Sequence, residues 1–186
     1  MIMVTAEQLD RMNVILNCIP GATKKAWKSV IKRANQTVRS ETTKQISKIY
    51  AISQKDIRAE TNISIKTKTN GDDVVGEVEF SGYKIPLYRF NVTPKTVKHG
   101  ATIKAAQLKS SQQTVFEHAF IAMMKSGHIG MFERKSKKPF PIKEFMGSST
   151  AQMAANTVVV EKVEEKAKET IDKRIEHEIS RILNSY

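Results

Sequence analysis

The sequence predicts an α+β fold: N-terminal helices, then an antiparallel β-meander sheet, then a long C-terminal amphipathic helix packed on the sheet. Apolar residues recur every three to four positions at both ends of the chain, which is the helical period. The middle alternates apolar and polar residues between turn signals, which is typical of strands. Because 186 residues fit one domain, we expect a single domain, with helices over 1–60, the sheet over 61–147 and the last helix over 148–186.

The N-terminal part is expected to hold two helices and a short third. Thr5 and Gln8 have capping-box spacing, and the first helix ends at Pro20-Gly21. The second helix covers about 22–50, where a thin apolar stripe opposes a basic face. The sequence SQKD opens the third helix.

The middle predicts strands in sequence order. NISIKTKT and VVGEVEF flank the turn signal NGDD, which indicates a hairpin. TIKAAQL follows, and TVFEHAFIAMM over 114–124 is expected to form one further strand. HIGMFER and PFPIKEF close the sheet as a second hairpin.

The C-terminal part predicts the clearest helix. Ser149 can cap a helix at SSTAQM, with Gln152 three positions on. Over about 157–184 the outer face mixes Glu and Lys at pairing distance. The expected buried stripe consists of Val160, Val163, Ala167, Ile171, Ile175, Ile179 and Ile182 or Leu183.

The aromatic residues and the single cysteine are expected in the core. A lone Cys18 excludes an internal disulfide and a Cys-based zinc cage, and fits a small buried side chain. No aromatic strand suited to stacking on bases stands out. The aromatics placed in the core are Trp27, Tyr50, Tyr83, Phe90, Phe116 and Phe120.

The net charge is +12, and it is unevenly distributed. Residues 151–186 carry 6 basic and 7 acidic side chains, so the positive charge lies on the rest of the chain. Such a field favours nucleic acid or an acidic protein partner. The basic face of the second helix is either a contact for phosphates or a solvated surface, and its candidate contacts are Lys24, Lys25, Lys28, Lys32, Arg33 and Arg39.

A second basic group lies in the last hairpin, at the sequence RKSKK. The returning strand contains Pro139 and Pro141, so it is expected to begin as a sheet edge, and lysines protect such edges. The alternative is a cationic tip that contacts a neighbouring subunit or DNA. Its candidate residues are Arg134, Lys135, Lys137 and Lys138.

No specific catalytic or cofactor motif occurs, so no catalytic residue, metal or cofactor is expected. The histidines His99, His118, His128 and His177 lack ligand spacing. A small metal-free endoribonuclease that uses Tyr88, Arg89, His118 and Arg134 is the remaining enzyme hypothesis. The sequence has no run of 18 apolar residues, so no membrane-spanning helix is expected. The N-terminus lacks the pattern of a signal peptide.

Several motifs together resemble the minor tail protein Z family of long-tailed bacteriophages. The stretch GHIGMFERKSKKPFPIKEFMGSSTAQM and the ending RIEHEISRIL carry the resemblance most strongly. The segment IKRANQTVRSETTKQISKIYAISQKDI and the strand IPLYRF add to it, so it covers about 28–183. Ser148 stands where the family pattern has a proline.

The resemblance implies a structural, non-enzymatic protein with a single tail-completion-like domain over 1–186. It implies action in tail completion and head–tail joining at the head-proximal end of the tail. Expected partners are other tail or head-completion proteins and further copies of the chain in a homo-oligomeric ring, with non-specific DNA contact and no membrane. The expected location is the virion tail, and the host cytoplasm during assembly. The alternative is a basic nucleic-acid-binding protein that acts alone.

Overall fold

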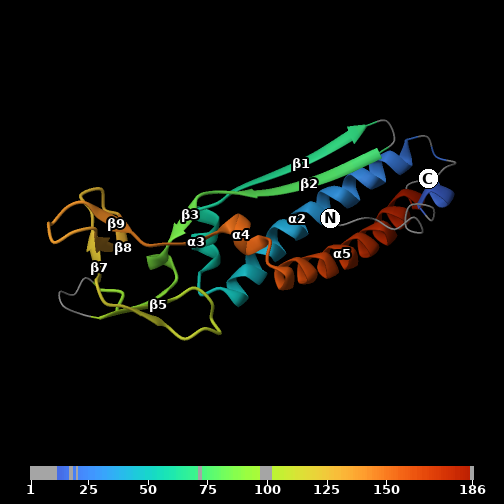
Figure 1. Cartoon of the computed structure of the whole chain (residues 1–186). Helices are drawn as coiled ribbons and strands as arrows, with labels where there is room; N and C mark the ends of the chain where they lie inside the picture. Colours follow the sequence, from blue (N-terminus) through green and yellow to red (C-terminus); the bar gives the residue numbers. More distant parts are fainter. Residues whose placement is uncertain (1–11, 17–18, 20, 71–72, 97–101, 185–186) are drawn as a thin grey trace. The chain divides into compact units, whose positions relative to one another are not determined.

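Figure 1 shows a computed structural model of the chain, which describes residues 12–16, 19, 21–70, 73–96 and 102–184. It confirms the α+β class: helices come first, short strands fill the middle, and a long helix follows. The predicted cap at Thr5, the cysteine Cys18 and His99 lie outside the described residues. The helices are α2 (Ala22–Ile49), α3 (Gln54–Ala59), the 3-10 helix η1 (Leu87–Arg89), α4 (Thr150–Ala154) and α5 (Thr157–Leu183). The strands are β1 (Asn62–Asn70), β2 (Asp73–Ser81), β3 (Lys84–Pro86), β4 (Asn91–Thr93), β5 (Ile103–Ala106), β6 (Thr114–Phe116), β7 (Ala119–Met123), β8 (Ile129–Arg134), β9 (Ile142–Glu144) and β10 (Met146–Ser149).

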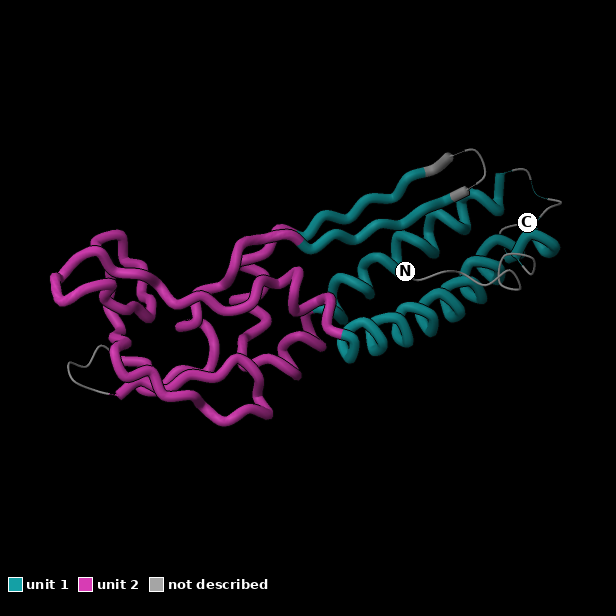
Figure 2. Tube along the Cα trace, in the orientation of Figure 1, with its two compact units in different colours: residues 1–42, 63–80, 157–186 teal, residues 43–62, 81–156 magenta. Residues whose placement is uncertain are grey.

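The chain forms two compact units (Figure 2). Unit 1 consists of Met1–Thr42, Ile63–Phe80 and Thr157–Tyr186, and unit 2 consists of Thr43–Asn62 and Ser81–Asn156. Each unit therefore joins segments that are distant in the sequence. The single domain over 1–186 stays a prediction.

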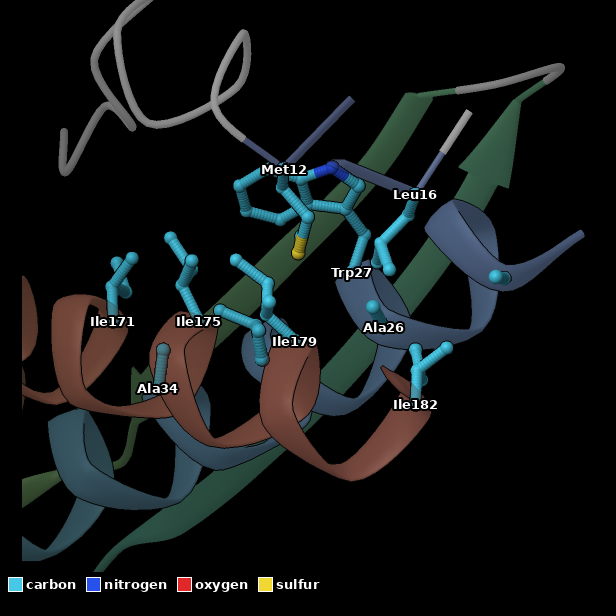
Figure 3. Close-up of a cluster of buried hydrophobic side chains, with 11 residues drawn as sticks. Met12, Leu16, Ala26, Trp27, Ala34, Ile171, Ile175, Ile179 and Ile182 are labelled. Atoms are coloured by element: carbon cyan, nitrogen blue, oxygen red, sulfur yellow. The ribbon is translucent and has the colours of Figure 1, made fainter. Parts of the chain in front are cut away.

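The core of unit 1 is formed mainly by α2 and α5, together with the helical residues 12–16. Figure 3 shows Met12 beside Trp27, with Ile175 and Ile179 projecting from α5. Val74 of β2 is partly buried against this cluster, so the last helix packs on helix α2 and on the β1–β2 sheet. The cluster consists of Met12, Leu16, Ala22, Ala26, Trp27, Val30, Ala34, Ile171, Ile175, Ile179 and Ile182.

The buried stripe of α5 confirms the predicted helical period. Val163, Ala167, Ile171 and Ile175 are all buried. At the start of the helix the stripe runs through Val159, which is 0% exposed, whereas Val160 is 37% exposed. Placing Val160 in the stripe was wrong, because four-residue steps back from Val163 lead to Val159.

The β1–β2 sheet is held on α2 by a polar contact and by a close approach. The side-chain amide of Asn35 donates to the carbonyl oxygen of Lys66 at 3.3 Å. A Cβ atom at Gly76 would lie 2.5 Å from both Asn35 Oδ1 and Ile31 Cγ2. Glycine is therefore required where β2 passes over α2.

Unit 2 contains α3, η1, α4 and three small sheets. β4, β5 and β6 form one antiparallel meander, and β7, β8 and β9 form another. β10 pairs with β3, with Met146 opposite Pro86 and Ser149 opposite Lys84. The fully buried core residues include Ile57, Ile85, Phe90, Met131 and Met153.

Serine side chains cap two helices of unit 2. The Asp56 amide donates to Ser53 Oγ at 3.1 Å at the start of α3. At α4, the Gln152 amide donates to Ser149 Oγ at 3.3 Å, and the Ser149 amide donates to Gln152 Oε1 at 3.0 Å. The second pair is the predicted capping box.

Three expectations for the middle of the chain were wrong. Residues 114–124 do not form one strand, because a turn at Glu117 and His118 separates β6 from β7, and both side chains are exposed. Tyr83 is not in the core, because it lies in the connection before β3 and is 94% exposed. Of the strand IPLYRF, only Ile85 and Pro86 lie in β3, because Leu87–Arg89 form the 3-10 helix η1. The alternation pattern therefore shows where strands occur, but not how long they are or how they divide into sheets.

Candidate functional site

The six basic candidates of the second helix lie on α2 within unit 1, and all six are exposed. Lys25, Lys28 and Lys32 are three and four residues apart, so they line one face of the helix. Within the part of the chain that the structure describes, these three lysines form no hydrogen bond or ion pair through their side chains. Arg33 differs, because its guanidinium donates to Gln36 Oε1 at 3.5 Å. Lys24 and Arg39 are the other two of the six basic candidates on α2.

The surface of α5 in the same unit is organised differently. Lys162 lies 3.0 Å from Glu165, and both Lys166 and Lys173 lie 2.6 Å from Glu169. Hydrogen bonds from Lys166 and Lys173 lower the pKa of Glu169 to about 2, and the bond to Glu169 raises the pKa of Lys166. Lys162, Lys166 and Lys173 are therefore paired within their own helix.

The four basic candidates of the second hairpin, between β8 and β9 in unit 2, are also exposed. The structure assigns Arg134 a role inside this hairpin: it donates to the carbonyl oxygen of Pro139 at 2.7 Å, and its guanidinium carbon lies 5.2 Å from the centre of the Phe120 ring. The remaining cations Lys135, Lys137 and Lys138 form the tip, with Phe140 72% exposed beside them.

The Gly147-Ser148 stretch, where the family resemblance is strong, lies in strand β10 and is held by close contacts. A Cβ atom at Gly147 would lie 2.7 Å from the Phe90 ring, so a larger residue would require that buried ring to shift. The Ser148 amide donates to Gln107 Oε1 at 2.9 Å, a bond that the family's proline could not donate. A hydrogen bond therefore holds this part of β10 where the family pattern has a proline ring.

One charged cluster in unit 1 was not identified from the sequence. The side chain of Glu178 is 1% exposed, and its carboxylate lies 2.6 Å from Arg174 and 2.9 Å from Arg181. Ser29 of α2 donates to the same carboxylate at 2.8 Å. The spacing of Arg174, Glu178 and Arg181 on one helix was visible in the sequence, but nothing indicated Ser29.

The environment of Glu178 stabilises its charged form. Burial raises the pKa of this carboxyl, but the hydrogen bonds from Ser29 and Arg181 and the charges of Arg174 and Arg181 lower it more. The pKa of Glu178 therefore lies below its ordinary value of 4.5. The cluster links α5 to α2 and has the character of a structural clamp.

The residues of the endoribonuclease hypothesis are engaged in separate contacts. Arg89 lies 3.4 Å from Asp56 and 3.5 Å from Glu60, and the Tyr88 hydroxyl donates to the Lys95 carbonyl oxygen at 3.0 Å. His118 is exposed in its turn. Among the described residues, no hydrogen bond or ion pair joins Tyr88, Arg89, His118 and Arg134 to one another.

Two other histidines contact carboxylates. His128 Nε2 lies 2.7 Å from Glu144 Oε1, across the β8–β9 sheet, and His177 lies 3.8 Å from Glu178. In the described ranges, no group of three or more His, Cys, Asp or Glu side chains could hold a metal ion. None of the described helices is long and apolar enough to span a membrane.

Comparison with protein families assigns the chain. The model of the family prophage minor tail protein Z (GPZ) matches residues 6–186. Searches of curated proteins and of solved structures give no match. The match includes α2, the β8–β9 hairpin and the Glu178 cluster, and it agrees with the resemblance seen in the sequence. The chain therefore belongs to the prophage minor tail protein Z family, whose members are structural proteins of the phage tail.

Proposed function

We propose that this protein completes the phage tail and joins it to the head, as a non-enzymatic component at the head-proximal end. The observation that carries the proposal is the match to the minor tail protein Z family over residues 6–186, nearly the whole chain. Its activity is then binding, and its partners are other tail proteins and head-completion proteins.

The exposed side chains of unit 2 support a role in assembly. Tyr83 is 94% exposed, Phe140 is 72% exposed and Met123 is 65% exposed. Exposed aromatic and Met side chains are enriched where proteins bind one another. Together with the Lys135, Lys137 and Lys138 tip, they give the unit both apolar and charged contacts for a neighbour.

We propose further that the chain acts as a homo-oligomeric ring in the virion. Closed rings are the usual way in which identical subunits meet a tube, because a cyclic arrangement satisfies every copy of an interface. The chain would be made in the host cytoplasm and carried in the finished tail.

The test is a deletion of the gene in the parent prophage, with electron microscopy of the induced lysate. We expect full heads and separate tails that fail to join, and restoration of joined particles when the gene is supplied from a plasmid. A gold-labelled copy should mark the head-proximal end of the tail. Normal infectious particles from the deletion strain would refute the proposal.

A further inference from the structure

The two long helices of unit 1 differ in whether their exposed lysines form ion pairs. On α5, Lys162, Lys166 and Lys173 each pair with a glutamate of the same helix. On α2, Lys25, Lys28 and Lys32 form no such pair among the described residues, and the helix contains no acidic residue before Glu41. Residues of both helices belong to one hydrophobic core, so the two lysine patterns occur within the same packed unit.

The lysine row of α2, defined as Lys25, Lys28 and Lys32, opposes the stability of its own helix. Like charges three and four residues apart repel each other. Lys25, in the first turn of α2, is also unfavourable at the positive end of the helix dipole, and that turn contains no acidic residue to compensate it. Helix stability therefore does not explain the row, whereas binding to an anion does.

The row is also held in place. On one side of α2, Ser29 donates to Glu178 of α5 at 2.8 Å, and on another side Asn35 donates to the Lys66 carbonyl of β1 at 3.3 Å. These contacts fix the rotation of the helix, so the three lysines lie at axial steps of about 4.5 and 6 Å. A straight row of cations on a braced helix is suited to a regular line of anions.

We propose that the lysine row of α2 binds the phosphate backbone of double-stranded DNA without reading its sequence. Each DNA strand offers one phosphate per about 3.4 Å of duplex axis, so the long, flexible lysine side chains can each reach a phosphate without a fixed register. Lysine suits this task, because its charge is compact and needs no planar partner. The row contains no aromatic residue, which disfavours stacking on single-stranded bases.

This inference deepens the proposed function by naming DNA as a partner, and the two can fail separately. DNA binding is measured on the purified full-length chain, whereas tail joining is measured on the deletion phage. Absence of DNA binding would leave the role in tail joining untouched.

The experiment measures the affinity of the full-length protein for a labelled duplex of arbitrary sequence at salt concentrations between about 50 and 200 mM. The variant combines Lys25→Gln, Lys28→Gln and Lys32→Gln. The control combines Lys162→Gln, Lys166→Gln and Lys173→Gln, which removes the same charge from the same unit at lysines that already have glutamate partners.

Loss of three phosphate contacts should reduce the slope of log K against log salt by about 2.7. Over that fourfold range of salt, the wild type should then lose about 40-fold more affinity than the α2 variant. The control should keep the wild-type slope within about 1. The α2 variant should have a thermal midpoint at or slightly above that of the wild type, because it loses the repulsion between the three lysines.

Three results would overturn the proposal. The first is a wild-type protein that does not bind the duplex at the lowest salt. The second is an equal loss of slope in both variants, which would assign binding to the overall charge. The third is tighter binding of polyglutamate than of DNA, lost in the α2 variant, which would assign the row to an acidic protein.

Discussion

Replacing Glu178 by Gln should weaken unit 1 in a way that depends on pH. The change keeps the size of the side chain and removes its charge, so it separates electrostatics from packing. The carboxylate accepts hydrogen bonds from Ser29 at 2.8 Å and from Arg181 at 2.9 Å, and it forms an ion pair with Arg174 at 2.6 Å. The amide of Gln removes the negative charge that both guanidinium groups face at this position.

The loss of unfolding free energy in Glu178→Gln should be smaller than the loss caused by breaking a fully buried ion pair. Removing one partner of such a pair costs about 3–5 kcal/mol, because the other charge stays buried. Here the side chains of Arg174 and Arg181 are 32% and 52% exposed, so water can solvate them after the change. We therefore expect a loss of about 1.5–3 kcal/mol, the range for hydrogen bonds to charged groups.

The dependence on pH follows from the lowered pKa of Glu178. A carboxyl whose pKa is lower in the folded state contributes stability above its unfolded pKa, and loses that contribution as the pH falls through its folded pKa. The difference between the wild type and Glu178→Gln should be largest at neutral pH and should shrink below about pH 4.5, the ordinary pKa of the group.

The assay is denaturant unfolding followed by tryptophan fluorescence. Trp27 is the single tryptophan of the chain and lies in the core of unit 1, so its emission reports on that unit. The control is Glu169→Gln, whose ion pairs are exposed and should weaken as salt rises. An unchanged unfolding midpoint for Glu178→Gln at neutral pH, or a difference that grows as the pH falls, would refute the reasoning.

Three further predictions concern packing and the hairpin tip. Ile171→Ala should lower the free energy of unfolding of unit 1 by about 2–4 kcal/mol, because it truncates a buried side chain. Val160→Ala, at a 37% exposed position, should cost about 0.5 kcal/mol or less. An unchanged unfolding midpoint for Ile171→Asp would show that the helix is not packed there. Gly76→Ala should cost about 1–3 kcal/mol because the new Cβ meets Asn35 and Ile31, and Asn35→Ala in the same chain should recover part of the loss; a fully tolerated Gly76→Ala would contradict the close approach of β2 to α2. Lys135→Ser, Lys137→Ser and Lys138→Ser together should leave the thermal midpoint unchanged and lower the infectious titre of the complemented phage; full titre would leave the tip as a solvated hairpin end.

The helices could be predicted from the sequence because their signals are local. The four-residue steps that bury Ala167 and Ile171, and the reciprocal spacing of Ser149 and Gln152, lie within one or two turns of helix. At the start of α5 the sequence does not decide which residue continues the buried stripe, because both Val159 and Val160 are apolar. Only the tertiary packing of the folded chain decides between them.

The grouping of the strands could not be predicted, because pairing is not local. β3 pairs with β10 across the whole middle of the chain, and Ser29 contacts Glu178 over a separation of 149 residues. No period in one sequence encodes such contacts. The turn between β6 and β7 was missed because Glu117-His118 breaks a strongly apolar pattern at only two positions.

The candidate site was predictable in its residues but not in its partners. Charge and helical period place Lys25, Lys28 and Lys32 on one exposed face, as the structure has them. Neither signal separates lysines that have no partner among the described residues from paired ones such as Lys166, nor shows that Arg134 contacts Pro139 and Phe120. These differences depend on which groups the fold brings within hydrogen-bonding distance.

If the protein joins tails to heads, purified full-length chain should restore the joining that a deletion lysate lacks. Full-length protein should be added to a lysate of the deletion prophage, which holds separate heads and tails, and the infectious titre should then be measured. We predict that the titre rises with protein concentration towards that of the wild-type lysate, and that Ile171→Asp protein gives no rise. A deletion lysate whose titre is unchanged by folded wild-type protein, or is already that of the wild type, would contradict the account.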